Sequence, residues 1–128
     1  MPVKYSVLSG VLWLRLEGAY TFEEVKQALS SAFKDSGFVK GMTLLIDLRK
    51  AGVRVTGDEL RERAEYYASL RDYLSPKRAL VVAPPELFEL SRSFQTYAGM
   101  QGLEVCLCTE VDEALRYLDE TEAASKSD

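Results

Sequence analysis

Asp47 and Arg49 stand at the end of a short apolar run, Met42–Leu48, which predicts a strand buried on both faces. Residues two apart in a strand share a face. The pair would lie at the carboxyl end of a central strand, where open α/β sheets bind ligands. Arg49 can hold a carboxylate or phosphate through two parallel hydrogen bonds. The alternative is structural: an internal ion pair, or Asp47 accepting N–H groups from the following loop.

A second candidate group lies in the helix that Pro84-Pro85 is expected to open. The spacing of Phe88, Ser91 and Arg92 predicts that they share one flank of this helix. We expect this flank, together with Arg49, to complete a pocket for a small anion or a lipid headgroup. A solvated or salt-bridged flank is the competing interpretation.

Thr56 is a candidate phosphoacceptor, because it precedes a predicted helix whose free N–H groups and dipole favour an anion. Glu59 follows at the spacing of a capping box, in which the hydroxyl and the carboxylate each accept a free backbone N–H. This capping box alone accounts for the threonine, so N-capping is the simpler interpretation of Thr56.

The chain contains no histidine. This excludes the Ser–His–Asp triad, the Cys–His dyad and histidine-based metal sites. A general base would have to be a carboxylate, lysine or thiol with a strongly shifted pKa. Because no base–nucleophile pair is visible, we expect a protein that is not an enzyme and that holds no cofactor or metal.

The chain has two cysteines, Cys106 and Cys108, in a predicted strand. We expect their side chains to point to opposite faces and therefore not to form a disulfide. Without further Cys or His, the four ligands of a structural zinc site are missing. The sequence thus predicts buried, inert thiols in a reducing, cytoplasmic protein.

The bulk composition describes a mildly acidic domain of 128 residues with a net charge of −4. An acidic balance disfavours nucleic-acid binding through a broad basic surface. No segment approaches the roughly 20 apolar residues that span a bilayer, so we expect no integral membrane protein. The N-terminal residues Met1–Tyr5 lack the apolar stretch of a signal peptide.

Apolar periodicity predicts the elements that position these side chains. Strands are expected at Val3–Ser9, Val11–Glu17, Met42–Leu48, Ala79–Ala83 and Leu103–Cys108. Helices are expected after Thr21, Thr56, Pro84 and Thr109, the second of them reaching Leu74 before Ser75-Pro76 stops it. This order predicts an α/β fold: an N-terminal β-hairpin, then alternating β-α units, in a mostly parallel mixed sheet of five strands with four main helices. We expect one domain over residues 1–120 and a disordered polar tail over 121–128.

Trp13, the single tryptophan, lies on the mixed face of the second predicted strand, beside Tyr5 or Val7 across the hairpin. If no helix covers that face, Tyr5 and Trp13 form an aromatic patch that is a candidate homodimer surface. Ordinary burial in the sheet is the alternative.

The whole pattern resembles the SpoIIAA-like (STAS) fold, and above all small stand-alone bacterial members; the lipid-binding CRAL-TRIO domains are a more distant relation. The matching pieces are Leu16-Glu17-Gly18, Leu45-Ile46-Asp47-Leu48-Arg49, Arg92-Ser93-Phe94 and the stretch Val111–Leu118. In phosphorylatable anti-sigma-factor antagonists of this group, the third strand ends in an aspartate, which Asp47 matches. An Asp-Ser-Ser-Gly motif then carries the phosphorylated serine. Here Thr56-Gly57 stands at that place, without a preceding aspartate.

These observations lead to one expected function and two alternatives. We expect a regulatory or binding module that recognises a protein partner or a small anionic or amphipathic ligand at the carboxyl edge of the sheet. One alternative is a carrier of lipid or small apolar ligands, with a cavity lined by Phe88, Tyr66 and Tyr67. The other, implied by the resemblance, is an antagonist-like regulator switched by phosphorylation of Thr56.

Overall fold

The computed structural model describes residues 2–8, 10–52 and 55–117; the expected tail at 121–128 lies outside them. The strands are β1 (Val3–Leu8), β2 (Val11–Gly18), β3 (Met42–Ala51), β4 (Leu74–Val82) and β5 (Glu104–Cys108). The helices are α1 (Phe22–Phe33), α2 (Gly57–Ala68) and α3 (Phe88–Met100), with a 3₁₀ turn at Pro85–Leu87 and a helix over residues 111–117.

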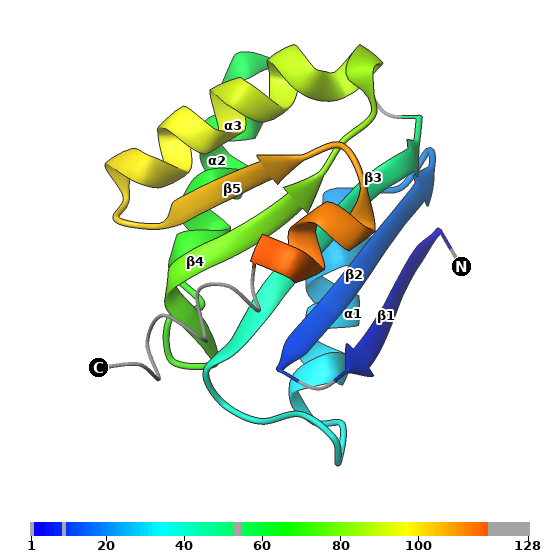
Figure 1. The fold of residues 1–128 in the computed structure, drawn as a ribbon, viewed down its shortest axis with the longest axis vertical. Helices are drawn as coiled ribbons and strands as arrows, with labels where there is room; N and C mark the ends of the chain where they lie inside the picture. The colour runs from blue at the N-terminus through cyan, green and yellow to red at the C-terminus, as the bar shows by residue number, and fades with distance from the viewer. Residues whose placement is uncertain (1, 9, 53–54, 118–128) are drawn as a thin grey trace.

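The described strands form one five-stranded sheet in chain order, β1-β2-β3-β4-β5. β1 and β2 are an antiparallel hairpin, and the neighbouring pairs from β2 to β5 are parallel. Right-handed crossovers between successive neighbouring strands place every crossover helix on the same face. Accordingly α1 and α2 lie behind the sheet in Figure 1, α3 runs along its β5 edge and packs on the same core, and the helix over 111–117 lies in front of the sheet. The predicted α/β fold is confirmed.

Each face of the sheet carries its own hydrophobic core, because alternate residues of a strand point to opposite faces. Leu12, Leu14 and Leu16 of β2 belong to the larger core, which the helices α1, α2 and α3 cover. The smaller core lies on the other face and contains these residues: Val11, Leu45, Leu80, Val82, Cys108 and Ala114. Ala114 belongs to the helix over 111–117, so that helix closes the second face.

Three predicted boundaries are wrong, and strand pairing explains them. The fourth strand was expected to begin at Ala79, but β4 begins at Leu74. The second helix was expected to reach Leu74, but α2 ends at Ala68 and Leu74 pairs with Met42 in the sheet. The third strand was expected to end at Leu48, but β3 continues because Lys50 and Ala51 pair with the end of β2. Hydrogen bonds between distant segments override the local apolar spacing at these positions.

Among the described residues, no helix combines the length and the apolar character that crossing a membrane requires.

Candidate functional site

A pocket of about 60 Å³ lies at the carboxyl edge of the sheet, on the face that α1, α2 and α3 cover. Leu16, Ile46 and Val81, from β2, β3 and β4, line its floor. Its walls come from α1, α2 and α3 and from the segments that precede them. In β-α units the strand ends and the helix beginnings meet at one edge, which is where such folds bind ligands. The predicted edge therefore carries a concave site.

Arg63 of α2 brings a positive charge to this otherwise apolar pocket. Its side chain is 12% exposed, and its Nη1 donates a hydrogen bond to the Tyr20 hydroxyl over 3.2 Å. The guanidinium carbon lies 5.6 Å from the ring centre of Tyr20 and 5.1 Å from that of Phe22. Of the described residues lining the pocket, Arg63 alone is charged.

Ser91 and Tyr67 add two hydroxyl groups to the pocket lining. The residues are only 4% and 7% exposed, and neither hydroxyl makes a hydrogen bond with another described residue. Buried polar groups are normally paired with protein or with bound molecules. Burial, the largest effect, raises the pKa of the Tyr67 hydroxyl, which therefore stays protonated. Both hydroxyls line the pocket and remain able to bond with a molecule inside it.

Asp47 and Arg49 lie on the other face of the sheet and form an internal pair. Asp47 Oδ2 accepts a hydrogen bond from Arg49 Nη2 at 2.8 Å, and Oδ1 accepts one from Arg49 Nε at 3.0 Å. The same carboxylate accepts hydrogen bonds from Trp13 Nε1 and from the Arg49 backbone, each at 3.1 Å. The internal ion pair considered for Asp47 is therefore realised, and the backbone N–H that it accepts belongs to β3 and not to the following loop.

The electrostatics of Asp47 do not suit a general base. Its burial raises the pKa, but the hydrogen bonds from Arg49 and Trp13 outweigh burial and hold the pKa below its usual value. A base that works near neutrality needs a raised carboxyl pKa.

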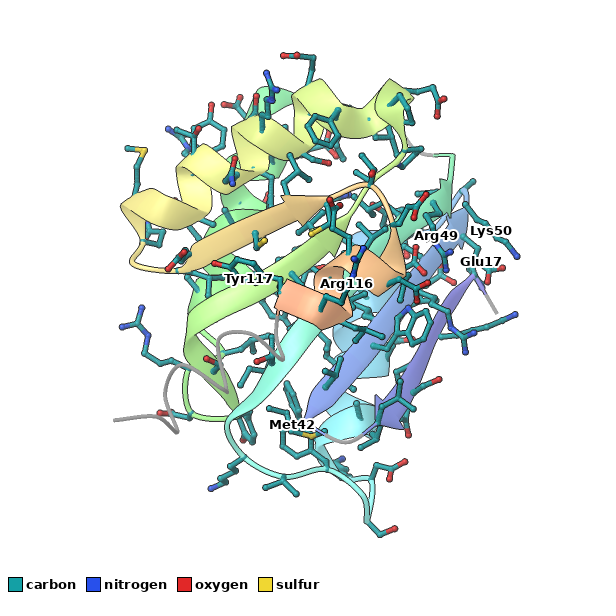
Figure 2. The ribbon with its side chains drawn as sticks, viewed as in Figure 1. Glu17, Met42, Arg49, Lys50, Arg116 and Tyr117 are labelled. Atoms are coloured by element: carbon teal, nitrogen blue, oxygen red, sulfur yellow. The ribbon has the colours of Figure 1, made fainter. Side chains whose placement is uncertain are left out.

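Figure 2 shows Arg49 beside Lys50 and Glu17 at one end of the sheet.

The predicted flank of α3 is divided by the structure. Ser91 is buried and lines the pocket, whereas the Arg92 side chain is 62% exposed. Arg92 lies 3.7 Å from Glu89 and 5.4 Å from the ring centre of Phe88. Arg49 and Arg92 therefore do not complete one pocket, and Arg92 has the salt-bridged surroundings given as the alternative.

Thr56 is the N-cap of α2. Its hydroxyl accepts the Glu59 backbone N–H at 3.2 Å and donates to Glu59 Oε1 at 3.0 Å. The Thr56 backbone N–H donates to the same carboxylate oxygen at 3.3 Å. Thr56 thus has the expected capping box, and a phosphate at this hydroxyl would meet the Glu59 carboxylate.

Tyr5 and Trp13 point to opposite faces of the sheet and do not form one aromatic patch. In the hairpin Tyr5 pairs with Leu14, and Trp13 pairs with Ser6. The Tyr5 hydroxyl donates to Asp35 at 3.1 Å on the side of the larger core. Trp13 packs against the smaller core.

The expectation that Cys106 and Cys108 point to opposite faces was wrong. Their sulfur atoms lie 3.8 Å apart, because residues two apart in a strand share a face. Burial, followed by the neighbouring Cys106, raises the pKa of the Cys108 thiol to about 12. Within the described ranges, no group of three or more Cys, Asp or Glu could hold a metal ion.

Sequence reasoning missed Arg63 and Tyr20, whereas Tyr67 was named as part of the cavity in the carrier alternative. Arg63 stands four residues after Glu59, a spacing that indicates an ordinary ion pair on a helix surface, and the structure contains this pair at 3.9 Å. Tyr67 is buried. The available signal was the hydroxyl: a tyrosine in a core stripe requires a partner for its polar end.

Neither a scan of protein-family models nor a search of curated proteins finds a match for this chain.

Proposed function

We propose that this protein is a binding module that takes up a small ligand in the pocket at the carboxyl edge of its sheet and performs no chemical step on it. The observation that carries this proposal is an apolar pocket lined by Arg63 and by the hydroxyls of Ser91 and Tyr67, neither of which bonds to another described residue. A ligand with a polar group can hydrogen-bond to both hydroxyls. A regulatory role through ligand binding is the form of this function that we favour.

The surroundings of Ser91 support binding rather than catalysis. A serine nucleophile needs a base within hydrogen-bonding reach. The Ser91 hydroxyl has no hydrogen-bond partner among the described residues. Asp47, a buried carboxylate near the same edge of the sheet, points to the opposite face and is held by Arg49.

The pocket size favours a small ligand over a lipid. Pockets for drug-sized molecules measure roughly 300–1,000 Å³. This pocket has about 60 Å³, so an acyl chain would require the helices to separate. Tyr67 lines the pocket as the carrier alternative expected, whereas Phe88 and Tyr66 do not.

The proposed STAS-like relationship is supported by the fold alone, through the β-hairpin and the β-α units that follow it. A cytoplasmic location is likewise proposed, and the two reduced thiols support it.

Amide NMR spectra with a library of small acids, alcohols, amides and amines test the proposed function. We expect some members to shift signals of pocket residues such as Leu16, Ile46 and Val81. Ser91→Met should fill the pocket and abolish these shifts. Ser93→Met, at an exposed position of the same helix, is the matched control and should keep them. Shifts that persist in Ser91→Met, or a library without effect on the pocket, would refute the proposal.

A further inference from the structure

The size of the pocket limits the ligand to a few atoms. One water position needs roughly 10–15 Å³ of such volume. A pocket of about 60 Å³ therefore holds on the order of four to six non-hydrogen atoms. Acetate, propionate and butyrate, and the alcohols and amines of similar length, fall in this range.

The polar groups of the pocket favour a hydrogen-bond acceptor. Arginine only donates hydrogen bonds, and it has five N–H groups. Arg63 donates one of these N–H groups to the Tyr20 hydroxyl. The hydroxyls of Ser91 and Tyr67 are further donors without partners among the described residues. A cationic ligand head would meet donors and a like charge.

The charge balance favours a single negative charge on the ligand. Arg63 is 12% exposed, and the described lining contains no acidic residue. Glu59 lies outside the pocket lining: its Oε1 is engaged in the α2 capping box, and its Oε2, on an exposed side chain, lies 3.9 Å from Arg63 Nη2. A monoanion is balanced by one guanidinium, whereas a phosphate dianion would bring an uncompensated charge into apolar surroundings, which is costly.

We propose that the ligand of this pocket is a short-chain monocarboxylate, with its carboxylate at Arg63 and its alkyl chain among the apolar side chains. This inference rests on the proposed function of the pocket. Guanidinium and carboxylate match geometrically through parallel hydrogen bonds. Ligands of this size bind weakly, so we expect dissociation constants in the millimolar range.

The test compares butyrate, 1-butanol, butylammonium and inorganic phosphate in amide NMR titrations at constant pH and ionic strength. We expect butyrate to bind at least about tenfold more tightly than 1-butanol, because only the acid gains the charge-assisted hydrogen bonds. We expect butylammonium and phosphate to leave the pocket signals unchanged.

Variants assign the charge effect to Arg63. Arg63→Gln should weaken butyrate binding at least about tenfold and leave 1-butanol binding unchanged, because only the acid needs the guanidinium. Arg61→Gln is the matched control: Arg61 is on the same helix, with a side chain that is 61% exposed, and its variant should bind like the parent. If Arg63→Gln does not fold, Ser91→Ala replaces it, with an expected loss of about threefold or more for butyrate, since one donor is removed.

The outcomes separate this inference from the proposed function. If 1-butanol or butylammonium binds in the pocket as tightly as butyrate, the monocarboxylate is refuted and the binding pocket stands. If Arg63→Gln folds and binds butyrate as tightly as the parent does, the proposal that the ligand's carboxylate binds at Arg63 is refuted. If none of the probes shifts a pocket signal, the monocarboxylate is refuted, and the broader library then decides the function of the pocket.

Discussion

Arg49 and Arg92 illustrate at the scale of single residues how surroundings decide a role. Both arginines were candidates for ligand binding. Arg49 engages the buried carboxylate of Asp47 through two side-chain hydrogen bonds, whereas Arg92 meets the exposed Glu89 and the ring of Phe88. A buried acceptor that loses its partner costs more free energy than an exposed ion pair contributes.

We therefore predict that Arg49→Ala lowers the free energy of unfolding by about 1 kcal/mol or more, because Asp47 keeps its burial and loses its charged partner. Arg92→Ala should change it by less than about 0.5 kcal/mol. Urea unfolding of the two variants measures both values. Equal, negligible effects would contradict the structural role of Arg49 and return it to the ligand-binding candidates.

The ion pair between Asp47 and Arg49 predicts that the free energy of unfolding depends on pH. The pKa of Asp47 in the folded protein lies below its usual value. Its pairing thus contributes stability above the unfolded-state pKa of about 3.9, and this stability is lost as the pH falls through the folded-state pKa. Urea unfolding of the parent and of Arg49→Ala is measured between neutral and strongly acidic pH. The difference between their free energies of unfolding should become smaller in acid. A difference independent of pH would exclude Asp47 as its source.

At the scale of elements, matching capping boxes begin α1 and α2. Thr21 with Glu24, and Thr56 with Glu59, each exchange the hydrogen bonds of this motif. These local devices position the helix beginnings from which Phe22, Leu60 and Arg63 reach the pocket. Capping is thus the role that the structure shows for Thr56.

We predict that Thr56→Ala lowers the free energy of unfolding by about 1 kcal/mol, because a free N–H of α2 loses its acceptor. Thr56→Ser keeps a hydroxyl at the N-cap and should stay close to the parent. Chemical unfolding followed by circular dichroism gives both values. An alanine variant as stable as the serine variant would show that the cap contributes nothing.

At the scale of the whole molecule, the sheet separates two hydrophobic cores, and one of them contains the proposed ligand pocket. One face, with α1, α2 and α3, contains the proposed ligand pocket. The other face holds Asp47, Trp13 and the helix over residues 111–117, which Figure 2 shows carrying Arg116 and Tyr117 across the strands. Arg49, which pairs with Asp47, and Arg63, which lines the pocket, thus lie on opposite sides of the sheet.

We predict that Ala114→Asp detaches the helix over 111–117 from the sheet. Ala114 is fully buried, and an unpaired charge at this position is unfavourable. The single tryptophan, Trp13, packs against the same core, so its fluorescence should shift to longer wavelength on contact with water. Arg116→Asp introduces the same side chain at an exposed position of this helix and should leave the emission unchanged. An unshifted spectrum in Ala114→Asp would contradict the described docking.

Much of the architecture followed from local patterns. The alternation of Leu12, Leu14 and Leu16, the capping boxes and the order of strands and helices predicted the α/β fold and the helix beginnings. Asp47 could also be placed, with an internal ion pair among its alternatives. These features depend on neighbours along the chain, which is why the sequence alone reveals them.

Only the tertiary structure decided the strand register, the side of the sheet on which each helix packs and the composition of the pocket. Pairing across the sheet moved Leu74 from a predicted helix into β4. Packing of α2 against the strand ends brought Arg63 and Tyr67 beside Ser91. Such contacts join segments far apart in the chain, and their free energy comes from burial and pairing that no local pattern records. The sequence determined the elements and their caps, and tertiary packing determined which side chains share a site.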